Sequence, residues 1–166
     1  SDFLMFAPRI YWRLFESVNA TYWPWQVLIV VSVLLWAWRC AWWWRVSGVV
    51  LSIAVALCAW AFLHQRFAPI FWVAEVYAWA FAAQALLLLA LVAGRGTDAT
   101  SVAEPARTRT AAAIARTRVG SALALWTVIG HPLLAPLAGR PWTQAEWPGL
   151  APDATAILVL AWLVRL

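Results

Sequence analysis

The sequence contains no lysine and little charge of any kind. All twelve basic residues are arginines, there are seven acidic residues, and charged residues make up 11% of the 166. A soluble domain carries about 25% charged residues. The absence of lysine excludes any mechanism that needs a lysine Schiff base, including that of a retinal-type photoreceptor.

Reactive motifs are equally scarce. The two cysteines, Cys40 and Cys58, have no CxxC or similar metal-binding spacing. There is no Gly-rich phosphate loop and no nucleophile elbow. Haem or chlorophyll ligation by His64 or His131 is a disfavoured alternative, because the HxxxH, CxxCH and ExxH spacings are all missing. The sequence therefore predicts a protein that is not an enzyme and has no metal site.

Apolar side chains are abundant instead. They make up 65% of the sequence, and the mean hydropathy is +0.77. A soluble chain of this length has too little polar surface to cover so much apolar material, whereas a bilayer accepts helices of about 20 apolar residues. We therefore expect residues 1–166 to form a single all-α integral membrane domain that crosses the membrane several times. The arginines, scattered between apolar runs, fit contacts with lipid headgroups rather than with nucleic acid.

The apolar runs define the expected helices. Arg9, Arg13 and Glu16 share one side of Pro8–Ala20, which predicts a helix lying in the membrane interface; the alternative is the first turns of a span. We expect membrane helices over Pro24–Trp44, Val46–Leu63, Pro69–Ala93, Val119–Ala138 and Asp153–Leu166. The last run is too short to cross a bilayer. It is either a half-span or, as we expect, part of a natural chain that continues past Leu166.

The distribution of arginine predicts the topology. The polar segment Gly94–Arg118 contains five arginines and is expected to be a loop. If the connections alternate between the two sides of the membrane, one side carries Arg39, Arg45, Arg95, Arg107, Arg109, Arg116, Arg118 and Arg165, and the other carries Arg9, Arg13, Arg66 and Arg140. The positive-inside rule then places the Gly94–Arg118 loop in the cytoplasm and the N-terminus outside.

Tryptophan and small residues indicate how the helices meet lipid and each other. Most of the fifteen tryptophans lie near the ends of expected spans, as in an interfacial aromatic belt. Small residues recur every four positions at Gly48, Ser52 and Ala56, and again at Ala78 and Ala82. Such spacing is typical of close helix contacts in membranes.

Four ionisable residues form the candidate site. With the predicted threading, Glu75, His131, His64 and Arg66 all lie toward the outer side, and ionisable groups within membrane segments are rare and often functional. We expect one outward-opening polar cluster, with Glu75 facing the bundle interior. Structural alternatives stay open: Glu75 pairs with Arg66 or accepts a hydrogen bond from a tryptophan N–H, and His131 only satisfies backbone groups freed by Pro132.

Three stretches, "PRIYWRLFESVNATYWPWQ", "FAPI" followed by "FAAQALLLL", and "GLAPDATAILVL", resemble an uncharacterised family of bacterial multi-pass membrane proteins, defined as a domain of unknown function. The shared positions are Asn19, Trp23, Pro24, Gln26, Phe67–Ile70, Gln84, Pro152 and Thr155. The resemblance implies a polytopic fold in the bacterial inner membrane and no known activity.

Two functions fit these observations. The first is a non-catalytic membrane subunit or scaffold that packs against other membrane subunits and lipids in a larger complex. The small-residue ladders, the dense tryptophan and the lack of a catalytic motif favour it. The alternative is a small transporter or ligand-binding membrane protein that uses the outward-facing cluster of Glu75 and His131.

Overall fold

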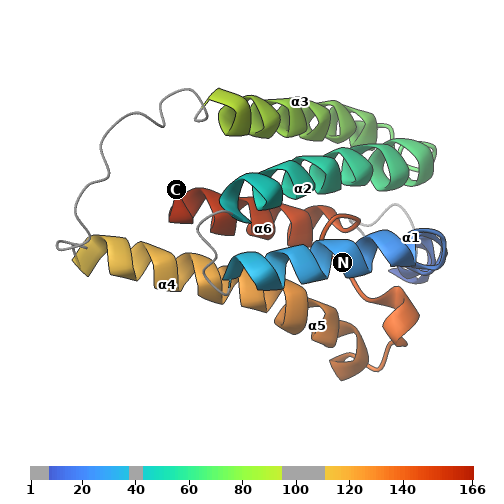
Figure 1. Cartoon of the computed structure of the whole chain (residues 1–166). Helices are drawn as coiled ribbons and strands as arrows, with labels where there is room; N and C mark the ends of the chain where they lie inside the picture. Colours follow the sequence, from blue (N-terminus) through green and yellow to red (C-terminus); the bar gives the residue numbers. More distant parts are fainter. Residues whose placement is uncertain (1–7, 38–42, 95–110) are drawn as a thin grey trace.

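The computed structural model describes residues 8–37, 43–94 and 111–166, and within these ranges it contains helices, turns and loops but no strand (Figure 1). Four helical stretches are long and apolar enough to cross a membrane: Arg9–Trp36, Trp44–Phe67, Val73–Gly94 and Ala113–Leu137. The expected all-α architecture with several membrane-length apolar helices is thereby confirmed.

The first helix, α1, runs without a break over Pro8–Ala37 and contains Pro24. The sequence predicted two elements here, divided before Pro24. Figure 1 shows the dark-blue N-terminal part of α1 nearly end-on, whereas the lighter remainder runs along the bundle. Pro24 lacks the N–H that would bond the carbonyl of Ala20, which gives the helix a physical reason to bend there. The predicted end at Trp44 was wrong, since this residue belongs to the next helix.

The second and third membrane helices form a hairpin. Helix α2, Trp43–Leu57, continues as the π-helical segment η1, Cys58–Phe67, so the second span ends four residues later than the predicted Leu63. A turn then leads into α3, Val73–Gly94. Its hydrogen bonds include Ile70 N to the Phe67 carbonyl and Phe71 N to the same carbonyl. The predicted start of the third span at Pro69 falls inside this turn.

The fourth rod has three parts. Helix α4, Ala111–Leu125, is followed by the π-helical turn η2, Trp126–Gly130, and by α5, His131–Leu137. The wide turn ends at Gly130, two residues before Pro132, whose ring displaces the carbonyl four residues back. The N–H of His131 accordingly donates to the carbonyl of Trp126, five residues earlier. Residues 111–118 of the predicted loop are helical, and 95–110 lie outside the described residues.

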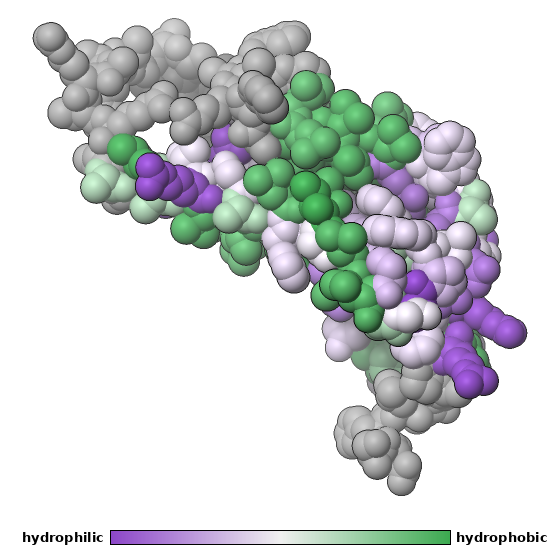
Figure 2. All heavy atoms as spheres, turned by 90° about the horizontal axis from the view of Figure 1, so that it is seen from below, coloured by the Kyte–Doolittle hydropathy of each residue, from purple (hydrophilic) through white to green (hydrophobic). Residues whose placement is uncertain are grey.

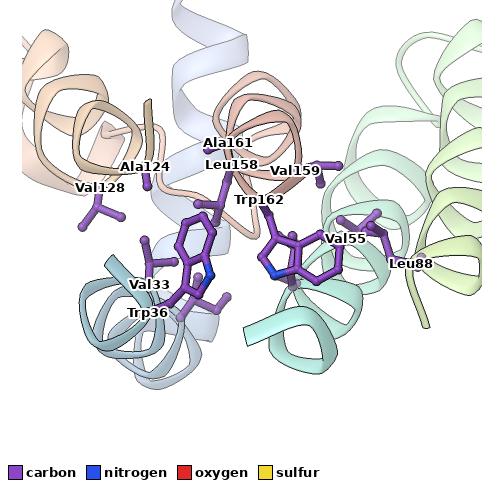
Figure 3. Packing of buried hydrophobic residues seen from close by; sticks show 14 of the residues in the cluster. Val33, Trp36, Val55, Leu88, Ala124, Val128, Leu158, Val159, Ala161 and Trp162 are labelled. Carbon is purple, nitrogen blue, oxygen red and sulfur yellow. The ribbon is translucent and has the colours of Figure 1, made fainter. Parts of the chain in front are cut away.

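The last helix, α6, Pro152–Arg165, is short but central (Figure 3). Its Trp162 is only 2% exposed, lies close to Trp36 of α1 in Figure 3, and donates from Nε1 to Ser47 Oγ at 3.2 Å. Gly48 makes room for this ring, since a Cβ there would lie 2.7 Å from Trp162 Cζ2. Within the core, Leu158 and Val159 extend the contact toward the other helices.

The helices alternate in direction along the bundle. At one end, on the right of Figure 1, lie the start of α1, the turn into α3 and the loop between α5 and α6. The ends of α1, α3 and α6 lie at the opposite end, together with the starts of α2 and α4. Figure 2 shows hydrophobic side chains across the middle of one face and the most hydrophilic ones toward the two ends. This distribution suits a bundle whose middle is in hydrocarbon.

Helix α3 is the outermost element and packs against α2 and η1 (Figure 1). Only its Ala74, Ala78, Ala85, Leu88 and Val92 are buried. The remainder of the helix presents large exposed apolar side chains: Val76, Tyr77, Trp79, Leu86, Leu87 and Leu89. These side chains therefore need lipid or another protein as a neighbour.

Candidate functional site

A polar clasp, formed by Asn19, Gln26, His131, Arg140 and Glu146, joins α1 to the loop between α5 and α6. Asn19 Nδ2 donates to the carbonyls of Thr143 and Ala145, each at 2.8 Å. Gln26 Nε2 donates to Asn19 Oδ1 at 2.6 Å. Because the two amides are seven residues apart, two helical turns bring them to one face of α1.

The other members of the polar clasp hold the loop from the side of α5. His131 Nδ1 donates to the Glu146 carbonyl at 3.2 Å, and since a carbonyl only accepts, the proton is on Nδ1. Arg140 Nη1 lies 3.5 Å from Glu146 Oε1, and its guanidinium stacks over the Trp12 ring at 5.0 Å. These contacts tie the loop to both α5 and α1.

Beyond the clasp, the loop enters α6 through a second set of bonds. Gly149 N donates to Thr155 Oγ1 at 2.8 Å, and Thr155 Oγ1 donates to the Ala151 carbonyl at 2.7 Å. Cys58 Sγ donates to the Leu150 carbonyl at 3.3 Å. Gly149 has φ of +90°, and a Cβ there would meet Ile29 Cδ1 at 2.4 Å, so only glycine fits.

The structure does not join the four predicted site residues into one network. His131 is buried in the polar clasp. Arg66 Nη1 donates to Ser17 Oγ, and His64 stacks on Trp60 with ring centroids 5.0 Å apart. In the part of the chain that the structure describes, no hydrogen bond or ion pair connects the Glu75 carboxylate to any residue; only its backbone N–H is bonded, to the Trp72 carbonyl at 3.2 Å.

Glu75 also points elsewhere than predicted. It is exposed rather than turned into the bundle, and since α3 begins at Val73 it lies in the first helical turn. A carboxylate there interacts favourably with the positive end of the helix dipole. This position gives a local physical reason for an acidic residue in an apolar stretch.

A second feature, the membrane-facing groove, lies between α2–η1 and α3. Its volume is about 560 Å³, and it is lined by Ala56, Ala59, Trp60, His64, Ala78, Trp79, Ala82, Ala85 and Leu86. Trp60 is 58% exposed and Trp79 69% exposed, so both rings are open to the surroundings. Glu75 lies on the same face of α3, one turn before Ala78 and Trp79.

Sequence reasoning did not predict the polar clasp. It named His131 as a candidate site residue, placed Arg140 and Glu146 on the same outer side, and gave Asn19 and Gln26 only as shared positions of the family resemblance. The available signal was the pair of amide residues, Asn19 and Gln26, at a two-turn spacing in an apolar helix. Their partners are mostly loop carbonyls, which carry no sequence signature.

Across residues 8–37, 43–94 and 111–166, no three His, Cys, Asp or Glu side chains are grouped so as to hold a metal ion.

Comparison with protein-family models, with curated proteins and with solved structures gives no match.

Proposed function

We propose that this protein is a non-catalytic integral membrane subunit or scaffold that packs against other subunits in a larger membrane complex. The observation that carries the proposal is the placement of α3. This helix contacts the bundle only along a narrow face and leaves an open groove of about 560 Å³ beside it. A surface of this kind suits contact with another membrane helix.

The state of the buried polar groups supports a structural role. Asn19, Gln26 and Thr155 are each less than 9% exposed, and every one has a hydrogen-bond partner within the chain. Polar side chains that already satisfy one another stabilise a unique packing. They are poorly placed to carry a substrate.

The threading that fits this role places the Gly94–Arg118 loop in the cytoplasm and the N-terminus outside a bacterial inner membrane. The alternating helix directions of Figure 1 are compatible with the arginine count on which this orientation depends. The N-terminal part of α1 would then lie along the outer interface, with Trp12 and Arg13 near the headgroups.

Gentle purification tests the proposal. The protein is extracted from its native membrane with a mild detergent through a tag, and the complex is separated on a native gel. We expect one or more different membrane proteins in a fixed stoichiometric ratio. Recovery of this chain by itself, or of a homo-oligomer, would contradict a subunit role.

A small transporter or ligand-binding protein is the alternative, and one observation favours it. The volume of the membrane-facing groove is within the range of about 300–1,000 Å³ typical of small-molecule sites, and His64 gives it a polar group. A homo-oligomer that retains a bound small molecule through purification would support this alternative.

A further inference from the structure

We infer that the membrane-facing groove binds one transmembrane helix of a different subunit, and that this helix carries an arginine or lysine at the depth of Glu75. The inference rests on the proposed function, and it adds the surface used and the chemistry of the partner. The floor of the groove, its walls and the charge at its end each contribute to the argument.

The floor is built from small side chains. Five alanines, Ala56, Ala59, Ala78, Ala82 and Ala85, line it from two neighbouring helices. In lipid, helices associate where small residues let their backbones approach closely. Large side chains of a partner helix can therefore reach between α2–η1 and α3.

The walls suit a helix lying along the groove. Trp60 and Trp79 stand on opposite sides, each more than half exposed. The lining residues of α3 extend from Ala78 to Leu86, which is about 12 Å or roughly two helical turns. A partner helix crossing here would cover apolar rings that otherwise face only lipid.

The end of the groove sets the charge of the partner. Glu75 continues the groove face by one turn, and its carboxylate makes no hydrogen bond or ion pair with any other residue that the structure describes. A carboxylate at a membrane-facing position is stabilised by a cationic partner, and arginine pairs with it in a bidentate manner. His64 lies on the other wall and adds no fixed negative charge.

A second copy of this chain fits the groove less well. A two-fold axis along the membrane normal would bring Glu75 of each copy to the same depth, so that like charges face one another across the contact. Lipid chains could fill the apolar part, but the alanine floor favours the close approach of a helix. A different subunit with a basic residue satisfies both the apolar floor and the carboxylate.

Photo-crosslinking in intact cells tests the inference with a matched pair of positions. A benzophenone amino acid replaces Leu86 in one variant and Leu87 in the other. The two leucines are adjacent and 69% and 70% exposed, but only Leu86 lines the groove. We expect the Leu86 probe to crosslink a transmembrane segment of a different protein, at a position about three helical turns from an arginine or lysine, since Leu86 and Glu75 are separated by about three turns of α3. The Leu87 probe should crosslink that segment much less.

The carboxylate is tested in the same cells. Glu75→Gln should lower the Leu86 crosslink about three- to tenfold, as expected for loss of one interhelical polar contact. Asp153→Asn, which neutralises another exposed first-turn carboxylate, should leave it unchanged. Glu75→Arg combined with a glutamate at the partner's basic position should restore it. If the Glu75 variants fail to accumulate in the cells, the inference is decided by comparing the crosslinks from the Leu86 and Leu87 probes in a chain that keeps Glu75.

Equal crosslinking from Leu86 and Leu87, adducts with lipid alone, adducts only with a second copy, or a partner segment without a basic residue would each overturn the inference. If other subunits co-purify but the groove does not crosslink to them, the docking surface is wrong and the subunit role stands. If nothing co-purifies, the proposed function itself fails.

Discussion

Single side chains in this protein act mainly by satisfying backbone groups that a loop at the bundle end would otherwise leave unpaired. Asn19 is the clearest case, because one amide serves two loop carbonyls and accepts from Gln26. Composition and spacing identified His131 as a polar position but not what it bonds, since the acceptor is the carbonyl of Glu146. A carbonyl is present at every residue, so only the fold selects it.

Replacing Asn19 tests this role of the polar clasp. Asn19→Ala removes three hydrogen bonds, two of them buried and one partly buried, and should lower the free energy of unfolding by about 2–3 kcal/mol. The measurement is a denaturant titration in detergent followed by tryptophan fluorescence. Thr21→Ala on the same helix, where the hydroxyl is exposed, should change the free energy of unfolding by less than about 0.5 kcal/mol. Equal unfolding curves for the two variants would contradict the clasp.

Substitutions at the two described glycines with positive φ, Gly139 and Gly149, distinguish the cost of backbone strain from the cost of a steric clash. Gly149→Ala meets Ile29 Cδ1 and also forces alanine to φ of +90°, so we expect a loss of about 2–4 kcal/mol. Gly139→Ala, at φ of +71° with nothing within 4 Å, should lose about 1 kcal/mol through strain alone. Thermal unfolding of both variants in detergent shows which one loses more stability. A smaller loss for Gly149→Ala than for Gly139→Ala would contradict this account.

At the level of helices, the presence of each helix was easier to predict from the sequence than its first and last residues. Apolar runs located every membrane-length helix, because hydropathy over about 20 residues is a strong signal. The ends were less certain because α3 is apolar on all sides, so that periodicity carries no mark of where it begins. Two prolines gave wrong helix starts. Pro24 was predicted to begin a helix but lies inside α1, and Pro69 was predicted to begin the third span but lies in the turn before α3.

The short helix α6 provides the element-level prediction. Trp162→Ala leaves a cavity between α1, α2 and α6 and removes the partner of Ser47, so the free energy of unfolding should fall by about 3–5 kcal/mol. Leu160→Ala, on the same helix but 52% exposed, should cost less than about 1 kcal/mol. Similar losses for both variants in a denaturant titration would mean that α6 does not form the core.

For the molecule as a whole, the distribution of charge and the alternating helices describe a bundle with two unlike ends. The end with the polar clasp is ordered by hydrogen bonds between α1 and the loop that precedes α6. Toward the opposite end, the first half of α4 carries Arg116 and Arg118, both exposed. The sequence shows which end of the bundle has more arginines. Which end faces the cytoplasm is decided when the chain inserts into the membrane, so it has to be measured in cells.

Topology is tested by labelling. A cysteine introduced at Thr100, after replacement of Cys40 and Cys58, should react with an impermeant maleimide only once the cells are opened, because the positive-inside rule places this loop in the cytoplasm. A cysteine at Gln144, in the loop at the other end, should react in intact cells. The reverse pattern would invert the proposed orientation.

The subunit role is tested most directly by native mass spectrometry of the protein released from its own membrane in lipid nanodiscs. Because the groove beside α3 is an open contact surface, we expect a defined assembly that contains this chain and at least one different membrane protein at fixed stoichiometry. Detection of this chain only as a monomer, or only as copies of itself with or without a bound small molecule, would contradict the account.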